Sequence, residues 1–317
     1  MRKVIIFLGF CLILNQTTII TAGMADAVPI DDFPFLLFQT GFEGTSHVFD
    51  WSYLKGKDET LEKSDFETDV ISWVEELRVQ SAPHKIGQQF AEIIPEQGNP
   101  DNHILHFQAN GYDAHAKKPL RIQVNVYEIK KGLKEFYQSV RMFLPEHMNE
   151  LKCYPTKWSH FTIFEIWNNY DWTGNPYAFR ISFNIYSYAY QGDNNLYFAI
   201  SAQDSNPGVF GWQTVWSARN SDMMVPVGEW FTMYYYFKEG DAANGRMTVQ
   251  IETAEHGKQT VFDMTNYTHS PRDPAPDGIQ GFNPLKMYSQ NALIDFMKSR
   301  EKPSIDIYWD DFKLYAK

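Results

Sequence analysis

Between residues 120 and 252 the sequence repeatedly alternates apolar and polar side chains with a period of two, and this pattern constrains the fold more than any other feature. The segments that carry it are "LRIQVNVYEI" (120–129), "FRISFNIYSYAY" (179–190), "NLYFAISAQ" (195–203), "FTMYYYFK" (231–238) and "RMTVQIE" (246–252). Such alternation is typical of a strand with one face on a core and one face toward solvent. Turn signals separate the segments, the strongest being Asn244-Gly245. Helical spacing is limited to 61–79, where strand formers compete, and to 283–299. We therefore expect an all-β, antiparallel β-sandwich jelly roll with few short helices.

The N-terminal residues predict an exported protein. Arg2 and Lys3 precede the apolar run Val4 to Leu14, and small and polar residues follow as far as Ala27. This order is typical of a secretory signal peptide over 1–27, with Ala22 as a second choice for the cleavage site. We therefore expect a secreted or periplasmic protein with a single β jelly-roll domain over 28–317.

A membrane attachment is not expected. The apolar run is shorter than the roughly 20 residues that a membrane-spanning helix needs, and no later stretch reaches that length. A lipid anchor on Cys11 is disfavoured, because bulky Phe10 precedes the cysteine and apolar sequence continues beyond it.

The net charge argues against nucleic acid as a partner. The whole chain has a formal charge of −11, and removal of residues 1–27 would leave 26 Lys and Arg against 38 Asp and Glu, a charge of −12. Phosphate binding needs a basic field, but a local group of Arg and Lys can still bind an anionic polysaccharide. Cys153 would be the single cysteine of the mature chain, so neither an intramolecular disulfide nor a thiolate metal cluster is expected. No organic cofactor is expected either.

The stretch "FTIFEIWNNYDW" (161–172) raises the question of a functional carboxylate. Alternation places Glu165 and Trp167 on one face and Phe164 and Ile166 on the other. We favour Phe164 and Ile166 in the core, with Glu165 and Trp167 on an exposed concave face, because an unpaired buried carboxylate is costly. In the alternative, the two faces are reversed and Glu165 is buried beside a partner.

The polar faces of the predicted strands describe a saccharide groove. Aromatic residues make up 16% of the chain, and many alternate onto one face together with planar amide and guanidinium groups that bond to hydroxyls or carboxylates. The predicted substrate-binding residues are Arg121, Gln123, Asn125, Trp167, Asn184, Tyr186, Tyr197, Gln203 and Lys238. The predicted catalytic residues are Arg180, Tyr234, Tyr236, His160 and Glu165. For any single tyrosine, a ring packed on a neighbouring strand is the competing interpretation.

The order of segments from "VNVYEI" through "FEIWNNYDW", "FRISFNIY" and "VPVGEWFTMYYYFKEGDAANGRMTVQIE" to "IYWDDFKLY" resembles the concanavalin A-like jelly-roll enzymes and lectins. More narrowly, it resembles the polysaccharide lyases of heparin lyase I and alginate lyase type, over about the last two thirds of the chain. The Gln-Ile-His strand of the alginate lyases and the paired-glutamate strand of the related endoglucanases are both missing. The resemblance therefore implies a fold and a substrate class, and no catalytic residue is carried over from it.

The chemistry expected of such a groove is β-elimination on a uronate-containing polysaccharide. That reaction needs a group that neutralises the carboxylate, a base for the C5 proton and an acid for the leaving oxygen. Arg, Asn or Gln suit the first task, and His or Tyr suit the other two. A glycoside hydrolase is an alternative, but it needs two carboxylates across the groove, and alternation offers Glu165 with Glu252 at best. The same groove would also suit a non-catalytic carbohydrate-binding protein, and an aromatic face of this kind would suit a surface protein that binds another protein.

The histidines give little sign of a transition metal, because strand alternation points His103 and His106 to opposite faces. The jelly-roll resemblance implies a structural Ca²⁺ instead, where an acidic pair on the last strand meets the first strand. Here Asp310 or Asp311 would meet Glu43, and carboxylates with loop carbonyls suit that hard ion. A solvated acidic turn is the competing interpretation.

Overall fold

A computed structural model describes most of the chain from residue 33 onward. The described residues are 33, 35–43, 52–53, 70–73, 89–112, 119–126, 132–155, 160–169, 176–205, 211–279 and 281–317. The predicted signal peptide lies outside these residues, so the expectation of export stays a prediction. Within the described ranges, no helix is long and apolar enough to span a membrane.

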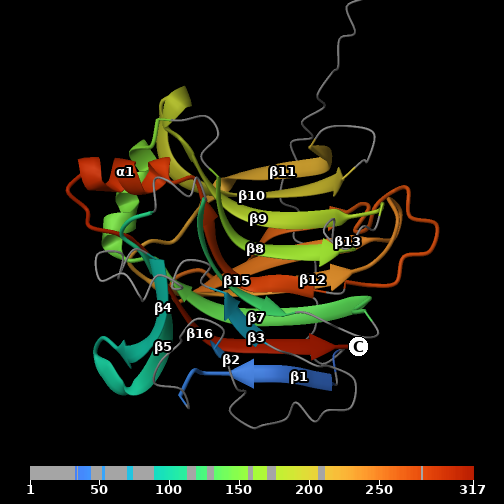
Figure 1. Cartoon of the computed structure of the whole chain (residues 1–317), viewed down its shortest axis with the longest axis horizontal. Coiled ribbons are helices and arrows are strands. Elements are labelled where there is room, and N and C mark those ends of the chain that lie inside the picture. Colours follow the sequence, from blue (N-terminus) through green and yellow to red (C-terminus); the bar gives the residue numbers. More distant parts are fainter. Residues whose placement is uncertain are drawn as a thin grey trace, which may run out of the picture.

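The described residues form two antiparallel sheets of eight strands each (Figure 1). In sheet A the strand order is β14 (Gly257–Thr265), β13 (Arg246–Thr253), β12 (Trp230–Lys238), β7 (Glu135–Phe143), β16 (Ile305–Ala316), β5 (Asn99–Ala109) and β4 (Gln89–Glu96). The strand β1 (Phe35–Thr40) lies off this path and pairs with the C-terminal part of β16. In sheet B the order is β11 (Trp212–Met224), β10 (Asp193–Ser205), β9 (Phe179–Tyr188), β8 (His160–Asn168), β15 (Gly281–Ser289), β6 (Leu120–Val126), β3 (Val70–Trp73) and β2 (Ser52–Tyr53).

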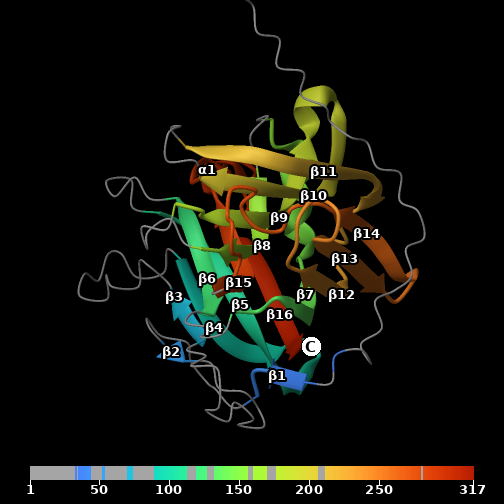
Figure 2. The same cartoon turned by 90° about the vertical axis from the view of Figure 1, so that its right-hand side faces the viewer.

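The two sheets pack face to face across one apolar core, which is the predicted antiparallel jelly-roll sandwich. Figure 2 shows β12, β13 and β14 together on one side of the molecule, with β8, β9 and β10 in the other layer. Phe164 of β8 stacks on Tyr235 of β12 at a ring-centroid distance of 4.1 Å, so ring packing joins the layers. Each sheet therefore has an inner face on the core and an outer face directed away from it.

The alternating segments form strands with the predicted inner faces. Ile122 and Val124 of β6, Ile181 and Phe183 of β9, and Tyr235 of β12 are all buried in the core. The predicted Asn244-Gly245 turn joins β12 to β13, and backbone N–H groups of both residues donate to Asp241 O. The local pattern therefore predicted both the strands and the orientation of their side chains.

Helices are few in the described residues. They are the 3₁₀ helices η3 (Glu146–Cys153) and η5 (Ala189–Gln191) and the α-helix α1 (Ala292–Ser299). The short helix expected near the end of 283–299 is α1, whereas residues 281–289 form the strand β15 between β8 and β6. Pro284 is accommodated where the register of β15 shifts, as expected for proline in a sheet.

Candidate functional site

The strand β8 positions the candidate site through its two faces. Phe164 and Ile166 lie in the core, so Glu165 and Trp167 project from the outer face of sheet B. This is the orientation favoured by the sequence. The neighbouring strand β9 presents Arg180 opposite Trp167 and Ser182 opposite Glu165. Alternation in β8 and β9 therefore brings a carboxylate, a guanidinium and an indole onto one face.

Glu165 is not exposed, which corrects the favoured expectation. Its exposed fraction is 5%, and its carboxylate bonds to the Lys286 ammonium. Ser182 Oγ donates to Glu165 Oε1 at 2.8 Å, and Arg180 Nη1 lies 3.6 Å from the same oxygen. The physical reason is strand pairing, because β15 lies beside β8 and supplies the lysine. The structure therefore combines the favoured orientation of the strand with the buried, partnered carboxylate of the alternative.

Glu165 and Lys286 each favour the charged form of the other. Burial by itself raises the pKa of Glu165, but Lys286 and Arg180 outweigh it and leave that pKa below its usual value. Burial lowers the pKa of the Lys286 ammonium, and Glu165 opposes that shift. Lys286 Nζ also donates to Asn283 Oδ1 at 3.0 Å. The site therefore holds an ionised glutamate inside a shell of donors.

Aromatic rings flank the cations on either side of Glu165. The Arg180 guanidinium carbon lies 4.4 Å from the ring centroid of Trp212 and 5.6 Å from that of Trp167, and the two indoles meet edge to face at 5.5 Å. Arg180 Nε donates to Gln203 Oε1 at 2.9 Å, so its orientation is fixed. These contacts bring together four predicted residues, and they add Trp212, which the sequence did not single out.

A second group lies across β15 and β6. Arg121 of β6 and Lys286 each lie 5.2 Å from the ring centroid of Tyr288. Arg121 was predicted, whereas Lys286 and Tyr288 were missed. Their signal is the alternation of "LKMYS", in which Leu285 and Met287 are buried in the core and alternate with the lysine and the tyrosine.

The remaining predicted residues of sheet B lie on or near this face. Gln123 and Asn184 are buried, and Thr162 Oγ1 donates to Asn184 Oδ1 at 2.6 Å. The Tyr186 ring lies 5.9 Å from the Arg219 guanidinium carbon. Burial and a hydrogen bond involving Asp193 raise the pKa of Tyr197. The side chains of Asn125 and His160 lie outside the described residues, so their predicted roles stay predictions.

Three predicted residues are on the other sheet, and their grouping with Arg180 is corrected. Tyr234, Tyr236 and Lys238 belong to β12, and their side chains alternate with the core residue Tyr235. They therefore project from the outer face of sheet A, on the opposite side of the sandwich from Glu165. The reason is that alternation assigns a side chain to a face of its strand, whereas strand pairing over long sequence distances assigns the strand to a sheet.

The environment of these tyrosines differs from that of the site on sheet B. Tyr234 donates to the Glu252 carboxylate, and Tyr236 donates to Glu135 Oε1 at 2.9 Å. Burial, followed by these carboxylates, raises the pKa of both phenols well above its usual value. Glu252 is likewise on sheet A, so it does not face Glu165 across one groove as the hydrolase alternative requires.

The predicted calcium residues approach one another where β1 meets β16. Glu43 Oε1 and Asp310 Oδ1 lie 3.7 and 3.9 Å from the point that a Cβ atom on Gly41 would occupy. Asp310 Oδ2 accepts from Arg141 Nη1 at 2.8 Å, and Asp311 Oδ2 lies 3.6 Å from the same nitrogen. Burial raises the pKa of Asp310 to about 6.

Two carboxylate oxygens near one point partly suit a calcium ion. The further oxygens that such an ion needs are not supplied by acidic side chains, because the described residues hold no group of three or more metal-ligating side chains. The Ca²⁺ ion stays a prediction.

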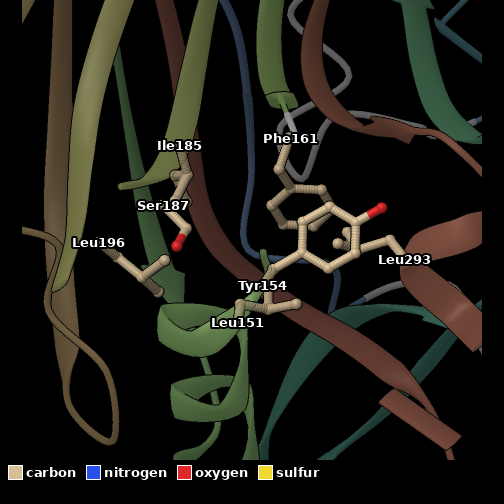
Figure 3. Close-up of a pocket in the computed structure, with 7 residues that line it drawn as sticks. All are labelled: Leu151, Tyr154, Phe161, Ile185, Ser187, Leu196 and Leu293. Atoms are coloured by element: carbon tan, nitrogen blue, oxygen red, sulfur yellow. The ribbon is translucent and has the colours of Figure 1, made fainter. Parts of the chain in front are cut away.

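A separate small cavity is unsuited to a glycan. It lies where η3 and α1 cover the ends of β8, β9 and β10, and Figure 3 shows Leu151, Tyr154 and Leu196 among the side chains that line it. Its volume of about 10 Å³ is close to the minimum for one water molecule, and its lining is almost entirely apolar. This cavity is a packing feature of the core.

Comparisons with known proteins find a likeness of fold. No family model matches the sequence, and no curated protein matches it. Among solved structures, the chain is similar to an endo-β-1,4-glucuronan lyase from the fungus Trichoderma reesei, with 12% identity, 73% of this chain and 89% of that chain covered, and a TM-score of 0.48. It is also similar to the alginate lyase Aly36B, with 13% identity, 87% and 95% coverage and a TM-score of 0.45. A marine alginate lyase from Aplysia kurodai shows 9% identity, 72% and 87% coverage and a TM-score of 0.43.

The class of protein is therefore defined by its architecture, an antiparallel β-sandwich of the jelly-roll type. Identities of this size describe a likeness of fold.

Proposed function

We propose that this protein is exported, binds a uronate-containing polysaccharide on the outer face of sheet B and cleaves it by β-elimination. The observation that carries the proposal is the local excess of positive charge around Glu165. Arg121, Arg180 and Lys286 surround one carboxylate, although the chain as a whole is acidic. Such a group attracts anionic sugars, and the neighbouring indole and phenol rings offer faces for stacking.

The side chains can be assigned to the tasks of the reaction. Arg180 packs against two indoles and bonds to Gln203, and its exposed fraction of 25% lets it pair with the substrate carboxylate. That pairing stabilises the negative charge that develops when the C5 proton leaves. The Tyr288 phenolate takes this proton, and the phenol so formed gives it to the leaving oxygen as the C4–O bond breaks and the C4–C5 double bond forms. Glu165 positions Lys286 beside the tyrosine ring.

The proposal is tested by following the ultraviolet absorbance of the unsaturated uronate product. The mature protein is incubated with alginate, glucuronan, heparin, chondroitin and pectin in turn. We expect product from one of these polymers, a loss of at least about tenfold in rate for Arg180→Ala, and a larger loss for Tyr288→Phe. The matched control is Arg300→Ala, which removes an exposed guanidinium that pairs with Glu150 at 2.8 Å near the end of α1. Equal activity of Tyr288→Phe and the unmodified protein would refute the assignment of the base.

A non-catalytic carbohydrate-binding protein is the second candidate, favoured by the stacking of Arg180 on Trp212. A guanidinium fixed on an indole forms a platform that suits binding without any reaction. This candidate predicts that every polymer stays intact, that the protein is retained on an alginate or pectin affinity gel, and that Trp212→Ala abolishes retention. Product formation that depends on Tyr288 would exclude it.

A further inference from the structure

A pocket of about 230 Å³ opens on the outer face of sheet A, on the opposite side of the sandwich from the proposed site. It lies at the start of β12, and its lining includes Trp230, Thr232, Arg141, Glu252 and Thr253. In the sheet, Thr232 pairs with Arg141 of β7 on one side and with Glu252 of β13 on the other. The pocket therefore sits on a row of hydrogen-bonding groups that crosses three strands.

A row of rings runs beside these polar groups. The ring centroids of Trp230 and Phe143 lie 5.4 Å apart, those of Phe143 and Tyr308 lie 5.9 Å apart, and those of Tyr308 and His106 lie 4.3 Å apart. The row crosses β12, β7, β16 and β5, and its first three rings are partly exposed. Rings beside donors and acceptors suit a sugar chain, whose apolar ring faces stack while its hydroxyls form hydrogen bonds.

The charges of the pocket select against anionic sugars. Arg141 is the cation that lines it, and its guanidinium carbon lies 4.6 Å from the ring centroid of Trp230. The same guanidinium is engaged by Asp310 at 2.8 Å, Asp311 at 3.6 Å and Glu96 at 3.9 Å. Glu252 adds a further carboxylate to the lining. Carboxylates thus outnumber the guanidinium, and like charges across an interface are costly. An uncharged sugar meets no such repulsion.

We propose that this pocket and ring row form a second glycan-binding site, specific for a neutral oligosaccharide. Trp230 stacks on the sugar unit in the pocket, Thr232 and Glu252 bond to its hydroxyls, and Phe143 and Tyr308 contact the next units. The inference goes beyond the proposed function, because it assigns another surface, another class of sugar and no reaction. A protein with both sites would hold a neutral polymer on one face while the other face acts on a uronate polymer.

Isothermal titration calorimetry of the mature protein with cellohexaose, xylohexaose and laminarihexaose tests the proposal. We expect binding of at least one of these, with an association constant about tenfold lower for Trp230→Ala, and within about threefold of the unmodified value for Trp230→Phe, which keeps a ring. Trp212→Ala is the matched control, because it removes an indole from sheet B and should leave this binding intact. Trp230→Ala should also retain the rate of uronate product formation.

Several outcomes would overturn the proposal. These are no binding of any of the three oligosaccharides, loss of binding in Trp212→Ala but not in Trp230→Ala, and displacement of the bound oligosaccharide by an alginate oligosaccharide. Thermal unfolding of each variant shows whether it is folded. If Trp230→Ala is not folded, Glu252→Gln provides the second test. We then expect a lower association constant for this variant in the same titration. Because product formation is a separate readout, failure of this site and failure of the proposed reaction are distinguishable.

Discussion

Removal of the Lys286 ammonium tests the electrostatic argument for the candidate site. Both members of the Glu165–Lys286 pair are 5% exposed, so Lys286→Met leaves a carboxylate buried without its main partner. Breaking a buried pair on one side costs roughly 3–5 kcal/mol of unfolding free energy. Arg180 Nη1 remains 3.6 Å from Glu165 Oε1, and Ser182 still donates to the same carboxylate. We therefore expect the free energy of unfolding to fall by about 3 kcal/mol, at the lower end of that range.

The loss should depend on pH with a definite sign. In the unmodified protein the lowered pKa of Glu165 makes this group stabilising at neutral pH, and that contribution declines as pH falls. In Lys286→Met burial dominates and raises the pKa of Glu165 above its unfolded value, so protonation relieves the penalty. The difference in stability between the two proteins should therefore shrink from pH 7 toward pH 4.

Urea unfolding followed by tryptophan fluorescence measures both effects. The double variant Glu165→Gln, Lys286→Met removes both charges, and we expect it to recover at least half of the loss. A loss below about 1 kcal/mol for Lys286→Met, as for an exposed pair, would refute the reasoning. So would a loss that does not change with pH.

Three further predictions concern other parts of the molecule. Burial by itself would raise the pKa of Asp306, but hydrogen bonds from two imidazoles hold that pKa below its usual value. Asp306 therefore contributes stability that declines in acid. Asp306→Asn should therefore lower the melting temperature at pH 7 and lower it less at pH 3. Added Ca²⁺ should raise the melting temperature, and at 100 times the dissociation constant it should add about 2.7 kcal/mol to the free energy of unfolding. Glu43→Gln should abolish this stabilisation. Gly278 has a φ of +90° and a Cβ there would meet Gly132 C at 2.7 Å, whereas Gly98, at +91°, has nothing within 4 Å. In urea unfolding Gly98→Ala should cost about 1–2 kcal/mol from the backbone alone, and Gly278→Ala clearly more; equal losses would show that the contact is unimportant.

Local alternation accounts for much of what the sequence predicted. The burial of Ile181 and Phe183 in the core, with Ser182 between them on the other face, follows from a two-residue period within one segment. No knowledge of the rest of the chain is needed for that assignment. The sandwich architecture follows in turn from several such strands, each with one apolar face to bury.

Strand pairing over long distances could not be predicted in the same way. Tyr234 and Arg180 have equivalent positions in their own segments, but β12 pairs with β7 and β13, whereas β9 pairs with β8 and β10. The two sheets interleave strands from the whole chain, so a polar face in the sequence gives no indication of its sheet. This is why the predicted groove residues divide between two surfaces.

Lys286 was missed for a different reason. Its strand β15 contains Pro284 and ends shortly before the helix α1, so the helical signal of the segment 283–299 concealed the strand. The strand forms because β8 and β6 on either side supply hydrogen-bond partners that the local sequence cannot reveal. Tertiary pairing therefore decided both the strand and the partner of Glu165.

Core packing fixes the register of the candidate site. A shift of β8 by one residue would turn Glu165 and Trp167 toward the core and expose Phe164, which now stacks on Tyr235 of the opposite sheet. That shift would remove a buried ring contact and place a charge in an apolar interior, and both changes are costly. The apolar half of β8 thus holds the polar half in place, with Glu165 set against Ser182 of β9 and Asn283 of β15. The positions of the carboxylate and its cations are therefore a consequence of the same residues that build the core.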